Sequence, residues 1–154
     1  MRYLIDTNVL ANFAEDDCLT NDVRALLVNY ENQIYVSSES VKEFIQLIQT
    51  ERIVLEKSFR SRDIFDLIEN EFGFHVKYVA KEHLQMLSKL ETVEGHNDPN
   101  DRLIIAQAIT EKIPLISSDI NGIKSPIVRE VNKLFRVKLS FAVSNLAASN
   151  SSAL

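Results

Sequence analysis

Short apolar runs alternate along the chain with segments in which apolar residues recur at helical spacing. The runs have the length of strands buried in a sheet, and they lie at residues 3–5, 34–36, 75–79, 115–116 and 136–139. Between these runs the spacing predicts helices. One starts at Val9, one follows a cap at Thr20 and one follows Asp98, and the others span residues 40–48, 58–72, 81–90 and 125–134.

This alternation of strands and helices predicts an α/β fold, a three-layer α/β/α sandwich on a central and mainly parallel sheet. The length of 154 residues fits one domain with a real core. We assign residues 1–140 to that domain. Residues 141–154 are rich in Ser, Ala and Asn, which predicts a frayed C-terminal tail.

The helix after Asp98 is the most apolar one. Between Leu103 and Ile109 only Gln107 is polar, a pattern typical of a helix at the centre of a domain. Asp98 followed by Pro99 is a favoured helix start, which predicts that Asp98 caps this helix. Asp101 then falls in the first turn, where the helix dipole favours an acid, although its side chain can equally point into a site.

Charge and cysteine content limit the partners and the cellular compartment that we expect for this protein. The net charge is −5, but residues 120–154 hold five basic residues against Glu130 alone, a net charge of +4. The acidic remainder does not favour nucleic acid as a partner, although a local basic surface still can bind it. The single Cys18 predicts a reducing cytoplasm. No apolar run approaches the roughly 20 residues that span a bilayer, so we expect no membrane partner.

Acidic residues follow the two strands predicted to be most deeply buried. Asp6 follows the run at 3–5, and Asp119 lies just beyond the run at 115–116. Because ligands of open parallel sheets bind beyond the carboxyl ends of the strands, we expect these acids to converge. Each can alternatively cap a helix. Glu43 is ambiguous as well, because Ser40 and Glu43 match a capping box.

If the acidic side chains lie close together, their negative charges repel one another unless a bound cation neutralises them. These side chains are Asp6, Glu43, Asp101 and Asp119. Carboxylate oxygens select Mg²⁺ or Mn²⁺ rather than zinc, and the three histidines and Cys18 show no zinc-ligand spacing. A carboxylate-held Mg²⁺ suits phosphodiester hydrolysis, in which it polarises the phosphoryl group and activates water.

Together with Glu43, three segments resemble the PIN-domain family, and more narrowly its VapC toxins of bacterial toxin–antitoxin pairs. They are Leu-Ile-Asp-Thr-Asn at 4–8, Asp-Pro-Asn-Asp-Arg-Leu-Ile-Ile-Ala-Gln-Ala at 98–108, and Leu-Ile-Ser-Ser-Asp at 115–119. The resemblance runs from residue 1 to about residue 140 in order and spacing. Its most specific part is the segment 98–108.

The resemblance implies a ribonuclease dependent on Mg²⁺ or Mn²⁺. Its catalytic and metal-binding residues would be Asp6, Glu43, Asp101 and Asp119, with accessory roles for Thr7, Asn8, Asp98 and Ser117. It also implies a homodimer and inhibition by a small cognate antitoxin protein. Alternatives are a PIN nuclease of RNA maturation or repair, and a PIN-like scaffold that binds without cleaving.

An acidic pocket repels RNA except through its metals, so cations elsewhere must hold the phosphate backbone. Two basic clusters are available, one over residues 52–62 and one over residues 124–138. We favour the second, with Lys124 and Arg129, because it follows Asp119 in the sequence. Any single one of these charges can equally be an ordinary solvated surface charge.

Overall fold

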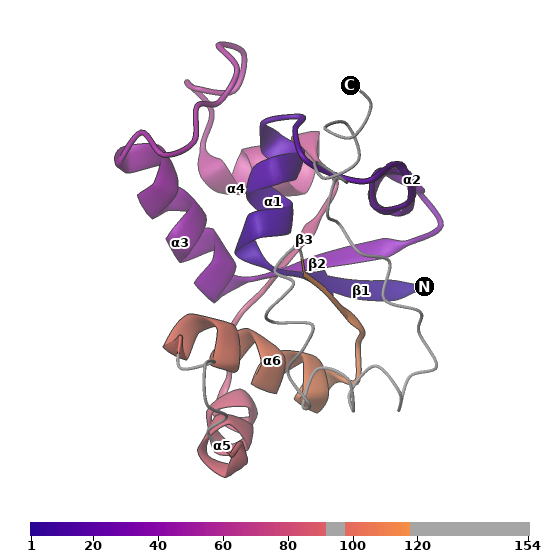
Figure 1. The fold of residues 1–154 in the computed structure, drawn as a ribbon, viewed down its shortest axis with the longest axis vertical. Helices are drawn as coiled ribbons and strands as arrows, with labels where there is room; N and C mark the ends of the chain where they lie inside the picture. Colours follow the sequence, from indigo (N-terminus) through magenta and orange to yellow (C-terminus); the bar gives the residue numbers. More distant parts are fainter. Residues whose placement is uncertain (92–97, 118–154) are drawn as a thin grey trace, which may run out of the picture.

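The computed structural model describes residues 1–91 and 98–117, and Figure 1 shows their arrangement. Four strands form a parallel sheet in the order β3-β2-β1-β4. They are β1 (Arg2–Ile5), β2 (Gln33–Ser37), β3 (His75–Lys77) and β4 (Leu115–Ile116). The predicted parallel sheet is confirmed, and β1 lies inside it, paired with β2 on one side and β4 on the other.

Helices cover both faces of the sheet. In Figure 1, α1 (Thr7–Ala14), α2 (Asn21–Val28) and α3 (Ser38–Gln49) lie on one side, with α4 (Ile64–Asp66) and the π-helix that continues it (Leu67–Glu71). On the other side lies α6 (Pro99–Glu111), and α5 (Lys81–Lys89) packs against its outer surface. The predicted α/β/α sandwich is therefore confirmed.

The side chains of β1 alternate between the two layers, as the period of a strand requires. Tyr3 and Ile5 belong to the larger core cluster, together with buried residues of α1, α2, α3 and the π-helix. Leu4 points the other way, into a smaller cluster with Ile104 and Leu115. The central strand is thus buried on both faces, which explains its uninterrupted apolar run.

The predicted helix over 58–72 is wrong in its first half. Residues 58–63 form turns, and α4 starts at Ile64 because the Asp63 side chain accepts hydrogen bonds from the amides of Phe65 and Asp66. This is ordinary N-cap chemistry, which prevails over apolar spacing at a helix start. Phe65, in the first turn of α4, is 37% exposed. Gly73 follows the helix with φ 71°, the left-handed conformation in which helices commonly end on glycine.

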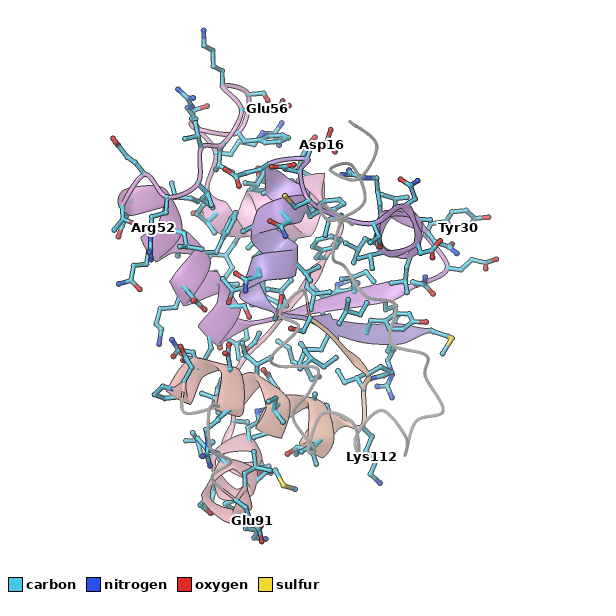
Figure 2. The ribbon with its side chains drawn as sticks, viewed as in Figure 1. Asp16, Tyr30, Arg52, Glu56, Glu91 and Lys112 are labelled. Carbon is cyan, nitrogen blue, oxygen red and sulfur yellow. The ribbon has the colours of Figure 1, made fainter. Side chains whose placement is uncertain are left out.

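Two apolar side chains at or beyond the helices are exposed. Tyr30 lies beyond the end of α2, is 95% exposed and points away from the sheet (Figure 2). Leu84 of α5 is 52% exposed, while His83 beside it is buried. Helix α5 turns His83 rather than Leu84 toward α6, because His83 forms polar contacts there that are described below. The predictions for residues 125–134, 136–139 and 141–154 lie outside the described residues.

Candidate active site

The carboxyl edge of the sheet brings Asp6 into a buried position directly after β1. Its Oδ1 accepts a hydrogen bond of 2.8 Å from the amide of Val9. Asp6 is therefore the N-cap of α1, which starts at Thr7 rather than at Val9 as the sequence suggested. Only 8% of Asp6 is exposed. Asp6 therefore follows the strand and caps the helix at once, so capping does not exclude the predicted role at the strand end.

Glu43 lies against the first residue of α1 because α1 and α3 leave neighbouring strands. The predicted capping box of Ser40 and Glu43 is wrong: Ser37 is the N-cap of α3, and its Oγ accepts from the amide of Glu39. Glu43 is consequently one turn further into the helix than a capping box needs. Its Oε2 instead accepts a hydrogen bond of 2.6 Å from Oγ1 of the buried Thr7.

Strand β4 adds Ser117 to the same edge. The amide of Asp6 donates a hydrogen bond of 3.1 Å to the carbonyl of Ile116, the residue just before Ser117. Ser117 is 7% exposed. The ends of β1 and β4 therefore lie side by side, and the chain that leaves β4 starts next to Asp6. Asp119, the acid predicted from this strand, lies outside the described residues, as do Lys124 and Arg129.

The acids of α6 occupy two different positions. Asp98 is the N-cap, as predicted, and its Oδ1 accepts a hydrogen bond of 2.8 Å from the amide of Asn100. Asp101 lies in the first turn and is exposed. Helix α6, which contains Asp101, lies on the opposite face of the sheet from α1 and contacts α3. Asn8, the remaining predicted accessory residue, is exposed in the first turn of α1.

The donor set favours a hard cation. The residues described at this edge supply carboxylate and hydroxyl oxygens, without a thiolate or an imidazole, and such oxygens suit Mg²⁺ or Mn²⁺. Within residues 1–91 and 98–117, however, no three His, Cys, Asp or Glu side chains are grouped closely enough to hold a metal ion. The described acids therefore fit the metal in their chemistry, and a complete ligand set needs more than they provide.

A polar network that joins β3, α5 and the C-terminal end of α6 was not predicted from the sequence. Nε2 of the buried His83 lies 3.0 Å from Oε1 of Glu111, and Nζ of Lys77 lies 3.1 Å from Oε2 of the same carboxylate. The amide of Ala80 donates to Nδ1 of His83, so the ring proton is on Nε2 and faces Glu111. Burial would raise the pKa of Glu111, but the hydrogen bonds from Lys77 and His83, together with the charge of Lys77, prevail and lower it.

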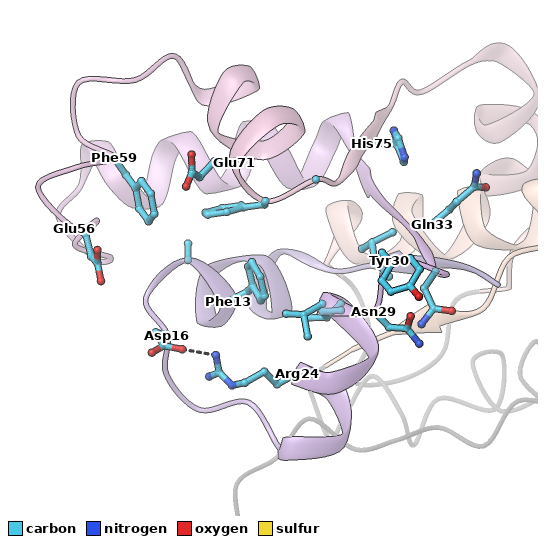
Figure 3. A pocket seen from close by; sticks show the side chains of 17 residues that line it. Phe13, Asp16, Arg24, Asn29, Tyr30, Gln33, Glu56, Phe59, Glu71 and His75 are labelled. Atoms are coloured by element: carbon cyan, nitrogen blue, oxygen red, sulfur yellow. Dashed lines mark hydrogen bonds and ion pairs between the residues drawn. The ribbon is translucent and has the colours of Figure 1, made fainter.

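A sizeable cavity lies elsewhere in the described part of the chain. It has a volume of about 870 Å³ and is bounded by the C-terminal half of α1, by α2 and by the residues around the π-helix (Figure 3). Phe13, Phe59 and Phe72 form apolar walls, and the ion pair of Asp16 with Arg24 closes one side. Because it also contacts Gln33 at the amino end of β2, this cavity is distinct from the carboxyl edge.

Comparison with known proteins identifies the class. The PIN domain family model matches residues 3–124, which is most of the chain. The chain belongs to the PIN-domain family, whose members are nucleases.

One similar solved structure is the crystal structure of VapBC2 from Rickettsia felis bound to a DNA fragment from their promoter. The TM-score is 0.58 at 18% sequence identity, and the match covers 83% of this chain and 96% of that chain. At this identity the likeness concerns the fold. No curated protein matches the sequence. Among the described residues, none of the helices is long and apolar enough to cross a membrane.

Proposed function

We propose that this PIN domain is a metal-dependent endoribonuclease that hydrolyses RNA phosphodiester bonds. The observation that carries the proposal is the 2.6 Å hydrogen bond from Thr7 to Glu43 at the edge where Asp6 is buried. Glu43 is thereby held against the residue that directly follows the buried Asp6 in the chain. Ordering one acid close to the position of a second, buried acid is unfavourable unless a cation or a proton neutralises them, so this arrangement favours a functional role.

Asp6, Glu43, Asp101 and Asp119 would hold Mg²⁺ or Mn²⁺. When bound, such an ion polarises a phosphoryl oxygen and lowers the pKa of a bound water. The contribution of the protein itself would be to hold these carboxylates in position and to neutralise the charge of the metal. Asp6 is fixed by the Val9 amide and Glu43 by Thr7, so neither carboxylate must be ordered when substrate arrives. Ser117, with Asn8 and Asp98 nearby on their elements, would support these acids.

We further propose that the nuclease is the toxin of a toxin–antitoxin pair, acting in the cytoplasm as a homodimer and inhibited by a cognate small antitoxin. Support comes from the motif resemblance and from the fold similarity to a VapBC2 structure. The described part of the chain offers no feature that favours an RNA-maturation nuclease or a non-catalytic scaffold instead.

For the RNA itself we propose contacts to Lys124 and Arg129. The other basic cluster is partly neutralised, because Arg62 pairs with Asp66 and Glu71. Nε of Arg60 donates to the carbonyl of Leu55. Replacing Lys124 and Arg129 with Ala in an Asp6→Asn background should weaken RNA binding and flatten its salt dependence by about one unit of slope per lost contact. Unchanged affinity and slope would move the RNA contact to residues 52–62.

The proposed function is tested by cleavage of RNA in the presence of Mg²⁺, of Mn²⁺ and of excess EDTA. Cleavage should require the metal, return when the metal is restored, and be absent from the Asp6→Asn variant. Metal should also raise the unfolding temperature of the wild-type protein and not that of the variant, because a ligand stabilises the state that binds it. Full activity in EDTA would contradict the metal mechanism. Metal binding without cleavage would favour the scaffold.

A further inference from the structure

A single peptide group lies between the two helices that supply Glu43 and Asp101. It joins Tyr78 to Val79, in the connection from β3 to α5. Its N–H donates a hydrogen bond of 3.2 Å to Oγ of Ser38, the first residue of α3. Its carbonyl accepts a bond of 3.4 Å from Nε2 of Gln107 in α6. Because the N–H and C=O of a trans peptide point in opposite directions, this group spans the space between α3 and α6.

Gln107 is anchored more firmly than this one bond suggests. The same Nε2 also donates to the carbonyl of Lys77 at 3.1 Å, so the side-chain amide holds two successive carbonyls at the end of β3. Gln107 is 0% exposed. It is also the only polar residue in the apolar body of α6 between Leu103 and Ile109.

This arrangement leaves polar atoms unsatisfied. Oε1 of Gln107 is buried without a hydrogen-bond partner in the described part of the chain, and the same is true of Oγ of Ser40, in the first turn of α3. A buried acceptor without a donor is unfavourable, and an apolar side chain of similar length would fill the same space without that cost. Packing alone therefore does not explain a glutamine here, whereas its two bonds to the β3–α5 connection do.

We propose that Gln107 is a positioning residue for the nuclease reaction. Through the Tyr78–Val79 peptide and Ser38, it sets the spacing between α3, which presents Glu43, and α6, which presents Asp101. This inference rests on the proposed function, because it concerns the distance between Glu43 and Asp101, two of the proposed metal ligands. Gln107 itself touches neither substrate nor metal.

The effect reaches the acids through rigid elements. Ser38 and Glu43 belong to one continuous helix, and so do Asp101 and Gln107. These helices are in contact with one another, while α6 contacts the sheet from the face opposite to α1 and α3. A shift of α6 against α3 therefore moves Asp101 relative to Glu43, and misplacement of reacting groups by about 1 Å can cost roughly a hundredfold in rate.

The test compares Gln107→Met and Ser38→Ala with the wild-type protein. Methionine has a similar length but no donor, and alanine removes the acceptor on the other side of the peptide. Thr110→Val is the matched control, because the Thr110 hydroxyl donates to the carbonyl of Ala106 within α6. For each protein we would measure kcat and KM for RNA cleavage, and Mn²⁺ affinity by calorimetry without RNA, well below the unfolding temperature.

We expect kcat to fall about tenfold or more in both Gln107→Met and Ser38→Ala, and Mn²⁺ binding to weaken, with KM for RNA nearly unchanged. The double variant should lose no more than the worse single one, because both residues act through one peptide. Thr110→Val should match the wild-type protein. A lowered unfolding temperature with wild-type kcat and Mn²⁺ affinity in both variants would overturn the inference. A wild-type protein that neither binds Mn²⁺ nor cleaves RNA would overturn the proposed function, and the role of Gln107 with it.

Discussion

Thr7 Oγ1 donates a hydrogen bond of 2.6 Å to Oε2 of Glu43, a residue 36 positions later in the chain. The bond joins the first residue of α1 to the middle of α3. It fixes one carboxylate oxygen of Glu43 against the helix that Asp6 caps. Thr7 therefore orients the Glu43 carboxylate relative to the start of α1.

Replacing Thr7 with Val should separate this contact from packing. Valine has nearly the same shape, so the buried volume is kept while the donor to Glu43 is lost. We expect RNA cleavage to fall about 10- to 100-fold, with a loss of about 1.5 kcal/mol in the free energy of unfolding. Thr7→Ser keeps the hydroxyl and should retain most of the activity. Equal losses in both variants would show that the methyl group matters instead.

Two substitutions of Asp6 should differ in stability and agree in activity. Asp6→Asn keeps a side-chain oxygen that can accept from the Val9 amide, whereas Asp6→Ala loses the cap of α1. We expect the alanine variant to be less stable by about 1 kcal/mol, as cap removal usually costs. Neither variant should cleave RNA, because both lack the charge. Chemical denaturation and a cleavage assay together check this, and an active Asp6→Asn variant would remove Asp6 from the proposed ligands.

The two acids at the start of α6 should behave differently. Asp98→Asn preserves an N-cap for the Asn100 amide, so its activity should stay within a fewfold of the wild-type level. Asp101→Asn should abolish cleavage while changing the unfolding free energy by no more than about 0.5 kcal/mol, since the residue is exposed. Cleavage rates under saturating metal provide the comparison. If Asp98→Asn is as inactive as Asp101→Asn, the assignment of Asp98 as a cap alone is wrong.

Glu111 should make the stability of α6 depend on pH. Its pKa is lowered in the folded protein by Lys77 and His83, despite the opposing effect of burial. A carboxylate with a lowered folded pKa stabilises above its unfolded pKa of about 4.3, and the stabilisation is lost as the pH falls through the folded value. Glu111→Gln should therefore be less stable than the wild-type protein at pH 7, and the difference should shrink below about pH 4. A constant difference from pH 7 to pH 3 would contradict this.

Features set by local chemistry were predictable from the sequence. Asp98 and Pro99 form the helix start that their side chains favour anywhere, and the apolar run at 3–5 is a strand buried on both faces. The placement of Asp6 after that strand also followed from the pattern. Such features depend on neighbours in sequence and on the general rule that parallel strands end at one edge.

Features for which several local sequence signals compete were not predictable. Ser37, Ser38 and Ser40 all precede apolar helical spacing, and only the end of β2 makes Ser37 the cap. Asp63 likewise starts α4 late, although apolar residues recur before it. The contacts of Gln107 and His83 join segments distant in sequence, so nothing in their immediate surroundings indicates them. Tertiary packing determines which of several adequate local signals is used.

Strand β1 pairs with β4, so residues 4 and 5 meet their partners only at residues 115 and 116. Parallel pairing over such a separation makes folding slow, because the intervening chain must close before the contact forms. During synthesis, Asp6, Thr7 and Glu43 leave the ribosome long before the strand that completes their edge of the sheet. We expect nascent chains that end before residue 115 to be inactive against RNA, which cleavage by stalled ribosome complexes of graded length would measure. A cell that makes this protein is then exposed to its activity only after nearly the whole domain has been translated.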